Sequence, residues 1–472
     1  MKKIKLFLDN FIVYGLGSII SKLVPFIMIP VITRLLPDSS YYGISELFNT
    51  MVMFASTFAT FGMYDSMFRF FFEEEASTYK KEICSTAFLF VLINSIIVFF
   101  IMVSFKTLLS ELFFDNKRYS YLVVLAALAA ILNSAHSMVG APTRMQNKRV
   151  RFLAVNTSGT IIAYSISLIL LKCQLYETAL PIGSIISSGI IILTFGVFNY
   201  TWFQFRYLKI EHLKQLLGIA LPVVPITFIY WIFNSCDKLM ITNMLSVEAT
   251  GLYSVGAKFG AVSQLIYTAF SGGWQYFAYS TMKDEDQVRT NSKIFECLGI
   301  VSFISTAFLC SVIYIIFKLL FEEAYVKAYI IAPYLFLAPL LQMLFQILCS
   351  QFTIHKKTWM NMFFLIVSAA FNFVANYFLI PVMGIEGAAL ATLLGYFIAV
   401  MISMYASYRL GYFRVGKKFL VSASILGGYF VLWRSFFSNN ILTGFVCAVL
   451  VTILYCVIYK NDIELLKGKL RV

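Results

Sequence analysis

Charged residues are scarce in this chain of 472 residues: only 13% are Asp, Glu, Lys or Arg, whereas 60% are hydrophobic. Soluble domains carry roughly 25% charged residues, so this composition excludes an ordinary soluble protein. Apolar runs long enough to cross the roughly 30 Å hydrocarbon core of a bilayer recur along the chain. The sequence therefore predicts an all-α integral membrane protein.

Motifs built from cysteine and histidine are also missing. The eight cysteines stand singly, with no CxxC pair and no cluster with the three histidines. Such spacing indicates neither a disulfide framework nor a structural zinc site. No cofactor is predicted, and coupling to H⁺ or Na⁺ is left open by the sequence.

Long loops are absent as well. About 14 membrane-spanning helices are predicted, at residues 11–33, 43–63, 83–105, 119–141, 152–171, 178–200, 216–236, 250–272, 295–317, 328–350, 361–381, 387–408, 419–436 and 440–459. The segments between them reach about 20 residues, which leaves no extramembrane domain to hold a catalytic site. We therefore expect a protein that is not an enzyme and that functions between its helices.

Lysine and arginine are unevenly distributed between the two sides of these spans. If the N-terminus is cytoplasmic, 26 of the 37 Lys and Arg residues fall in inner segments and 9 in outer ones, counting Arg434 at the outer end of the span 419–436, with Lys22 and Lys258 deeper inside spans. Positive residues are retained on the cytoplasmic side, so both termini are predicted to be cytoplasmic, in the cell membrane. Because the same bias accounts for the net charge of +14, no nucleic-acid partner is expected.

A weak internal repeat follows the first and seventh spans. TRLLPDSSYYG begins at Thr33 and TNMLSVEATG at Thr242, an offset of 209 residues, and Gly43 and Gly251 align at an offset of 208. Each block is followed by a helix of small and polar residues. Two lobes of six helices with the same orientation are therefore predicted, related by an axis along the membrane normal.

The repeat sets the predicted domain boundaries. Residues 1–210 would form an N-terminal lobe and residues 211–410 a C-terminal lobe. Two further helices and a cytoplasmic tail would occupy residues 411–472.

Two lysines lie where hydrocarbon is expected. Lys22 is about 11 residues from either end of its span, and Lys258 is about eight residues into the span 250–272. A lysine near the bilayer centre costs about 2.5 kcal/mol or more, so each should face water or protein and meet an anion. Glu46, on the polar face of the next span, offers Lys22 a different role, because an ion pair there would merely join two helices.

The remaining candidates have two readings each. Arg34 is either an exit contact for cargo or an ordinary interfacial arginine. Asp65 and Arg69 would close a cytoplasmic gate by pairing, unless Arg69 is only a topology signal. Asp237 and Lys238, at the outer end of the seventh span, form either an outer gate or a cap on the helix end.

Two further aromatic side chains are His136, inside the span 119–141, and Trp274, just after the span 250–272. His136 is expected to make a hydrogen bond between helices rather than to relay protons. Trp274 is a candidate for stacking on sugar rings, although nothing in the sequence distinguishes it from the other aromatic residues.

Four segments carry a family resemblance: RLLPDSSYYG, GMYDSMFRFFFEEE, CDKLMITNMLSVEATGLYSVGAK and GIEGAALAT. They resemble the Wzx-type polysaccharide flippases of the MOP superfamily, which includes the MATE drug exporters and the peptidoglycan lipid II flippase. The resemblance covers Asn10 to about Lys460. It implies an alternating-access transporter that turns an undecaprenyl-diphosphate-linked oligosaccharide from the cytoplasmic to the outer leaflet.

The resemblance also implies where cargo would bind. Spans 11–33, 43–63, 216–236 and 250–272 would line a central cavity, and the last two spans would form a groove for a lipid tail. In that cavity the lysines would offer compact positive charges to the diphosphate.

Partners and rivals follow from the same resemblance. The expected partners are membrane lipids, a polysaccharide polymerase and glycosyltransferases. A MATE-like cation-coupled multidrug exporter is the alternative, kept open by Glu46 although the first span carries a lysine. A membrane polymerase or ligase would need a large outer loop, which this chain lacks.

Overall fold

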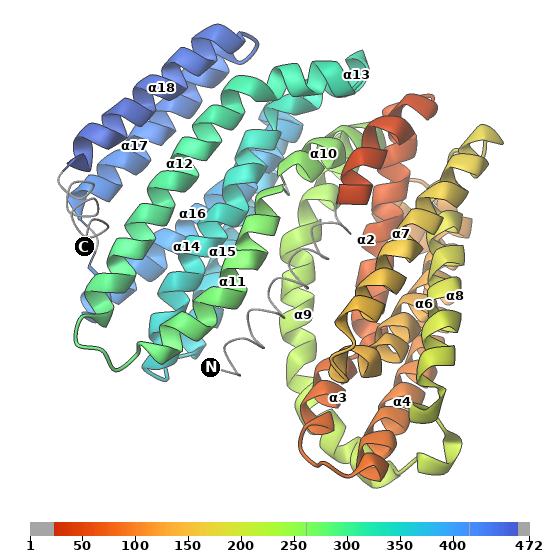
Figure 1. The fold of residues 1–472 in the computed structure, drawn as a ribbon. Helices are drawn as coiled ribbons and strands as arrows, with labels where there is room; N and C mark the ends of the chain where they lie inside the picture. The colour runs from red at the N-terminus through yellow and green to blue at the C-terminus, as the bar shows by residue number, and fades with distance from the viewer. Residues whose placement is uncertain (1–22, 261, 415, 461–472) are drawn as a thin grey trace. The chain divides into compact units, whose positions relative to one another are not determined.

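The computed structural model describes residues 23–260, 262–414 and 416–460, which are helical throughout and include no strand (Figure 1). An apolar helix over Leu23–Leu35 comes first. The others are α2 (Ser39–Thr60), α3 (Met63–Phe71), α4 (Ser77–Ser104), α5 (Lys106–Phe114), α6 (Ser120–Met145), α7 (Arg149–Lys172), α8 (Ala179–Asn199), α9 (Ile210–Met244), α10 (Val247–Gly260), α11 (Val262–Ser280), α12 (Gln287–Leu320), α13 (Glu323–Val326), α14 (Ala332–Ile354), α15 (Trp359–Met383), α16 (Ile385–Arg409), α17 (Lys417–Leu432) and α18 (Ile441–Ile458). Short 3₁₀ turns are η1 (Lys117–Tyr119), η2 (Tyr200–Trp202), η3 (Phe205–Tyr207) and η4 (Lys327–Ile330), and η5 (Trp433–Phe437) is a π-helix.

The prediction of a helical multi-pass membrane protein is confirmed, whereas the number of spans is not. Among the described residues, 11 helices are long and apolar enough to cross a membrane. The polar helix α2 is not one of them, and α10 and α11 share the predicted span 250–272. Most of the predicted span 11–33 lies outside the described residues.

The chain divides into two compact units, the first extending to Ser254 and the second beginning at Val255. We expected the second lobe to begin at residue 211, with the helix that is now seen as α9. In this structure α9 packs against α2, α3 and α4, and so belongs with the first unit.

Each unit has its own core. In the first, α2 packs on α6 and α4, and α6 on α8, where small residues such as Ala126, Ala127 and Ala130 allow close approach. In the second, α14 lies against α11, α12 and α16 and is the most buried of the candidate spans. The two C-terminal helices, α17 and α18, both pack on α12.

The two aligned glycines of the repeat face each other inside the first unit. A Cβ atom on Gly43 of α2 would lie 2.1 Å from the carbonyl oxygen of Val247, and one on Gly251 of α10 would lie 2.0 Å from that of Ser39. The contact is reciprocal, since each glycine meets the carbonyl four residues before the other. Glycine at both positions therefore lets the two helix backbones touch, which supports the repeat alignment.

Replacing either glycine with alanine should separate α2 from α10. We expect Gly43→Ala and Gly251→Ala each to destabilise the protein by about 1–3 kcal/mol, the usual cost of overpacking, measured as a lower melting temperature in detergent. Gly189→Ala on α8 is the matched control, because its Cβ would meet open space and alanine is otherwise the better helix former. Equal melting temperatures for all three variants would contradict the close crossing.

Candidate functional site

An ion pair buried between α2 and α9 is the centre of the candidate site. The Lys238 ammonium lies 2.7 Å from Oε2 of Glu46, whose side chain is only 6% exposed. Burying a carboxylate without a partner is energetically costly. The Lys238 ammonium offsets that cost for Glu46. The pair therefore fixes α9 against α2 within the first unit.

The neighbouring Asp237 points to a different helix. Tyr253 of α10 donates a hydrogen bond of 2.8 Å to its carboxylate, and both side chains are buried. Successive residues on an α-helix are about 100° apart, which is why two adjacent charges can face two partners. The reading of Asp237 and Lys238 as a cap on the helix end is wrong, because α9 continues to Met244 and both charges are engaged laterally.

Aromatic residues extend this contact along α2 and α9. The indole nitrogen of Trp231 donates to the carbonyl of Thr50 at 3.2 Å, and the Trp231 ring lies 4.8 Å from that of Phe54 and stacks on Phe228 at 6.0 Å. Trp231 is two turns before Lys238, just as Thr50 and Phe54 follow Glu46. The same faces of the two helices thus carry an ion pair at one level and an aromatic cluster at the next.

A second ion cluster ties α9 to α4 at its other end. Glu82 is buried and accepts from the Lys209 ammonium at 2.9 Å, and His212 Nε2 lies 3.0 Å from its second oxygen. The hydrogen bond to Glu82 raises the pKa of Lys209 above its ordinary value. Thr86 adds hydrogen bonds to the backbone N–H and carbonyl of Lys209. Sequence reasoning missed this cluster, because nothing local links residue 82 to residues 209 and 212.

The two predicted intramembrane lysines have different outcomes. Lys22 lies outside the described residues, so the prediction that it meets an anionic headgroup stays a prediction. Lys258 is half-buried on the last turn of α10, in the second unit. Arg34 is exposed at the end of the first described helix, a position that fits either of its two readings.

The expected pairing of Asp65 with Arg69 is not what this structure has. Arg69 lies 3.5 Å from Glu73, one turn further along, and both side chains are largely exposed. Burial raises the pKa of Asp65, and the positive charge of Arg144 opposes this rise. Arg144 also donates a hydrogen bond to the hydroxyl of Tyr64. Asp65 and Glu73 each lie four residues from Arg69 along the chain. In this structure Arg69 pairs with Glu73.

The two aromatic candidates, His136 and Trp274, both make hydrogen bonds between helices. His136 on α6 lies 3.0 Å from the side-chain oxygen of Asn156 on α7, which confirms the expected hydrogen bond between helices. Trp274 is buried, donates to Ser350 at 3.3 Å and stacks on Phe270. Its ring is therefore covered in this structure, and stacking on sugars stays a prediction. Within the described ranges, no group of three or more His, Cys, Asp and Glu side chains is placed to hold a metal ion.

Comparisons with known proteins agree on one family and one fold. A family model described as a polysaccharide biosynthesis protein matches residues 31–330. An Lsg locus protein of Haemophilus influenzae is 22% identical over 295 residues, covering 60% of this chain and 68% of that protein.

Solved structures of membrane transporters have the same fold. The lipid II flippase MurJ in an inward closed conformation matches with a TM-score of 0.71 at 13% identity, over 96% of this chain and 100% of that one. An inward-facing MATE-family multidrug transporter of the MOP superfamily matches with a TM-score of 0.56 at 12% identity, over 84% and 98%.

Breaking the pair between α2 and α9 should be costly only when one partner remains. We expect Glu46→Gln and Lys238→Met each to lower the melting temperature in detergent, since a lone buried charge costs about 3–5 kcal/mol. The double variant should recover more than half of that loss. Arg69→Gln, which breaks the exposed pair with Glu73, should change stability by less than about 1 kcal/mol. Additive losses in the double variant would show that Glu46 and Lys238 are not energetically coupled.

Proposed function

This chain belongs to the polysaccharide biosynthesis protein family, and we propose that it is a flippase for a lipid-linked oligosaccharide. Its cargo would be an undecaprenyl-diphosphate-linked oligosaccharide, turned from the cytoplasmic to the outer leaflet for assembly of O-antigen, capsule or exopolysaccharide. The family match over residues 31–330 is the observation that carries the proposal. The fold supports it, because a lipid II flippase matches the chain over nearly its whole length.

The chemistry of such cargo calls for fixed cations in a wet passage. A diphosphate cannot cross a low-dielectric layer as a bare anion, and an ammonium group offers it a compact positive charge. We assign that role to Lys22 and Lys258, with Arg34 as an exit contact. The alternative in which Lys22 only joins helices through Glu46 stays open, since one carboxylate can contact two basic side chains, as Glu82 does.

Gating is proposed for the charges that hold α9 to its neighbours. Alternating access requires contacts that form in one state and break in another. Asp237 and Lys238 connect α9 to α10 and α2, which supports their proposed role as a gate on the outer side. Asp65 and Arg69 remain candidates for a cytoplasmic gate in a state where Arg69 releases Glu73.

A drug exporter is the rival function, since MATE transporters share the fold. Two observations favour the flippase: the family match and the higher TM-score, 0.71 against 0.56, to the lipid II flippase. Coupling to H⁺ or Na⁺ is compatible with either function. The excess of Lys and Arg in inner segments supports a cytoplasmic-membrane location with both termini inside, where a polymerase and glycosyltransferases would be partners.

Removing the intramembrane cation should abolish transport without removing the protein. In cells whose surface polysaccharide depends on this chain, we expect Lys22→Ala to lose export and Lys22→Arg to keep part of it, because arginine restores charge but not the compact ammonium. Export is measured by surface polysaccharide immunoblot, and membrane abundance by tag immunoblot. Lys106→Ala, an exposed lysine at the start of α5, is the matched charge-removal control and should export normally.

Three outcomes would contradict parts of this proposal, the first two the role of Lys22 and the third the flippase function. Normal export by Lys22→Ala would remove Lys22 from the mechanism, and rescue of that variant by adding Glu46→Gln would mean that Lys22 only joins helices. Deletion cells that export polysaccharide normally but become sensitive to cationic drugs would favour the exporter instead.

A further inference from the structure

The second unit contains a cavity of about 620 Å³ between α16 and α17, which we call the α16–α17 crevice. Leu, Phe, Val and Met side chains of both helices line it, and α12 and α14 contribute its floor. Its volume lies within the roughly 300–1,000 Å³ of ligand-binding pockets. No residue of α18 lines it, so it differs from the lipid-tail groove that we expected between the last two spans.

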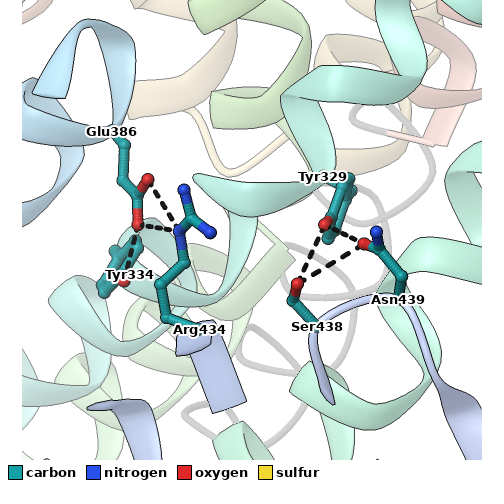
Figure 2. Close-up of polar contacts among 6 residues, drawn as sticks. All are labelled: Tyr329, Tyr334, Glu386, Arg434, Ser438 and Asn439. Atoms are coloured by element: carbon teal, nitrogen blue, oxygen red, sulfur yellow. Dashed lines mark hydrogen bonds and ion pairs between the residues drawn. The ribbon is translucent and has the colours of Figure 1, made fainter. Parts of the chain in front are cut away.

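One end of the crevice is charged. Arg434 donates from Nε to both carboxylate oxygens of Glu386, at 2.8 and 2.9 Å, and Tyr334 donates to the same carboxylate at 3.1 Å (Figure 2). Glu386 is 8% exposed, whereas the Arg434 side chain is 46% exposed. The terminal amino groups of Arg434 make no hydrogen bond within the described residues, as the open guanidinium in Figure 2 shows.

The π-helix at the end of α17 explains how Arg434 reaches this position. Trp433 is fully buried, and its indole nitrogen donates to the carbonyl of Cys310 on α12 at 2.9 Å. With Trp433 held against α12, the wider turn of a π-helix lets the next residue face α16. The loop that follows is held as well, since Tyr329 donates to Ser438 and Asn439 (Figure 2).

The charged end lies at the ends of the helices rather than at their middles. Glu386 is the second residue of α16, Tyr334 the third of α14, and Arg434 precedes the loop to α18. From Arg434 to Leu420, which also lines the crevice, the helix extends about 21 Å at 1.5 Å per residue. The crevice therefore runs from a cation at the level of a membrane interface into the hydrocarbon layer.

We propose that the α16–α17 crevice binds an anionic phospholipid of the surrounding bilayer, with the phosphate on the terminal amino groups of Arg434 and one acyl chain along the apolar walls. Two parallel N–H groups of a guanidinium match the geometry of a phosphate, and Glu386 holds the guanidinium so that this fork faces outward. The apolar length below it suits a hydrocarbon chain, which leaves the bilayer for an equally apolar surface and is held there by van der Waals packing. The inference is independent of the cargo proposed above.

The crevice offers a matched pair of glycines for the test. Gly427 and Gly428 are adjacent on α17, and a Cβ atom on either would meet open space. Only Gly427 lines the crevice. Gly427→Leu should therefore fill the cavity, whereas Gly428→Leu adds the same side chain outside it.

Lipid binding is measured by native mass spectrometry of the purified full chain, titrated with phosphatidylglycerol or phosphatidylcholine. We expect phosphatidylglycerol to bind at least about tenfold more tightly than phosphatidylcholine, equivalent to about 1.4 kcal/mol. Arg434→Gln should lose that preference, and Gly427→Leu should weaken the binding of both lipids at least about tenfold. Gly428→Leu should keep both the binding and the preference, and so should Glu386→Gln, whose amide oxygen can still accept from Arg434.

Three results would overturn the proposal. Equal binding of the two lipids, or equal binding by the two glycine variants, would show that the crevice is not the site. Equal loss in Arg434→Gln and Glu386→Gln would mean that the two side chains act only as a clamp between helices. Tighter binding of undecaprenyl phosphate in competition would assign the crevice to a polyprenyl lipid instead of a phospholipid.

Discussion

A charge in a membrane-spanning protein must be paired or wet, and this constraint organises both units. The cost of leaving a carboxylate alone in a low-dielectric interior is several kcal/mol. In the first unit, Glu46 is accordingly paired with Lys238, and Glu82 with Lys209 and His212. Both clusters lie on α9, at opposite ends, so the longest described helix is bound to the first unit by charge as well as by packing. In the second unit the same constraint joins α16 to the end of α17.

Helix packing in the first unit depends on small residues as much as on charge. The hydrophobic effect does little between helices in lipid, so close van der Waals approach supplies the association. Gly43 and Gly251 provide it where α2 crosses α10, each against the backbone of the other helix. Each glycine meets the carbonyl four residues before the other. A repeat that is weak in the sequence is thus supported by one reciprocal contact within the first unit.

The sequence predicts the fold class and the polar face of α2, but not the partners of its charges. Hydropathy locates the helices because every buried backbone group in lipid must bond within its own helix. Periodicity shows that Glu46 faces away from lipid, but the choice of Lys238 as its partner depends on how α9 packs, which is a tertiary property. Glu386 lies in a segment that we recognised by its glycine and alanine content, yet nothing nearby indicated Arg434. Likewise, the close packing of α9 on the first unit is set by contacts with α2, α3 and α4 rather than by any signal at residue 211.

The three ion pairs that have a buried glutamate share an asymmetry of exposure. The acidic side chains of Glu46, Glu82 and Glu386 are 6%, 11% and 8% exposed, whereas Lys238, Lys209 and Arg434 are 20%, 52% and 46% exposed. Long basic side chains reach from a helix toward water while a short carboxylate stays inside. Each pair therefore hides its negative member and leaves donors of its positive member accessible. A surface of this kind is better suited to an anionic ligand such as a lipid phosphate than to a cationic drug, which would need an accessible carboxylate. Where such a pair borders a ligand site, the charge of the accessible side chain bears on which ligand binds, and the shared fold does not decide this.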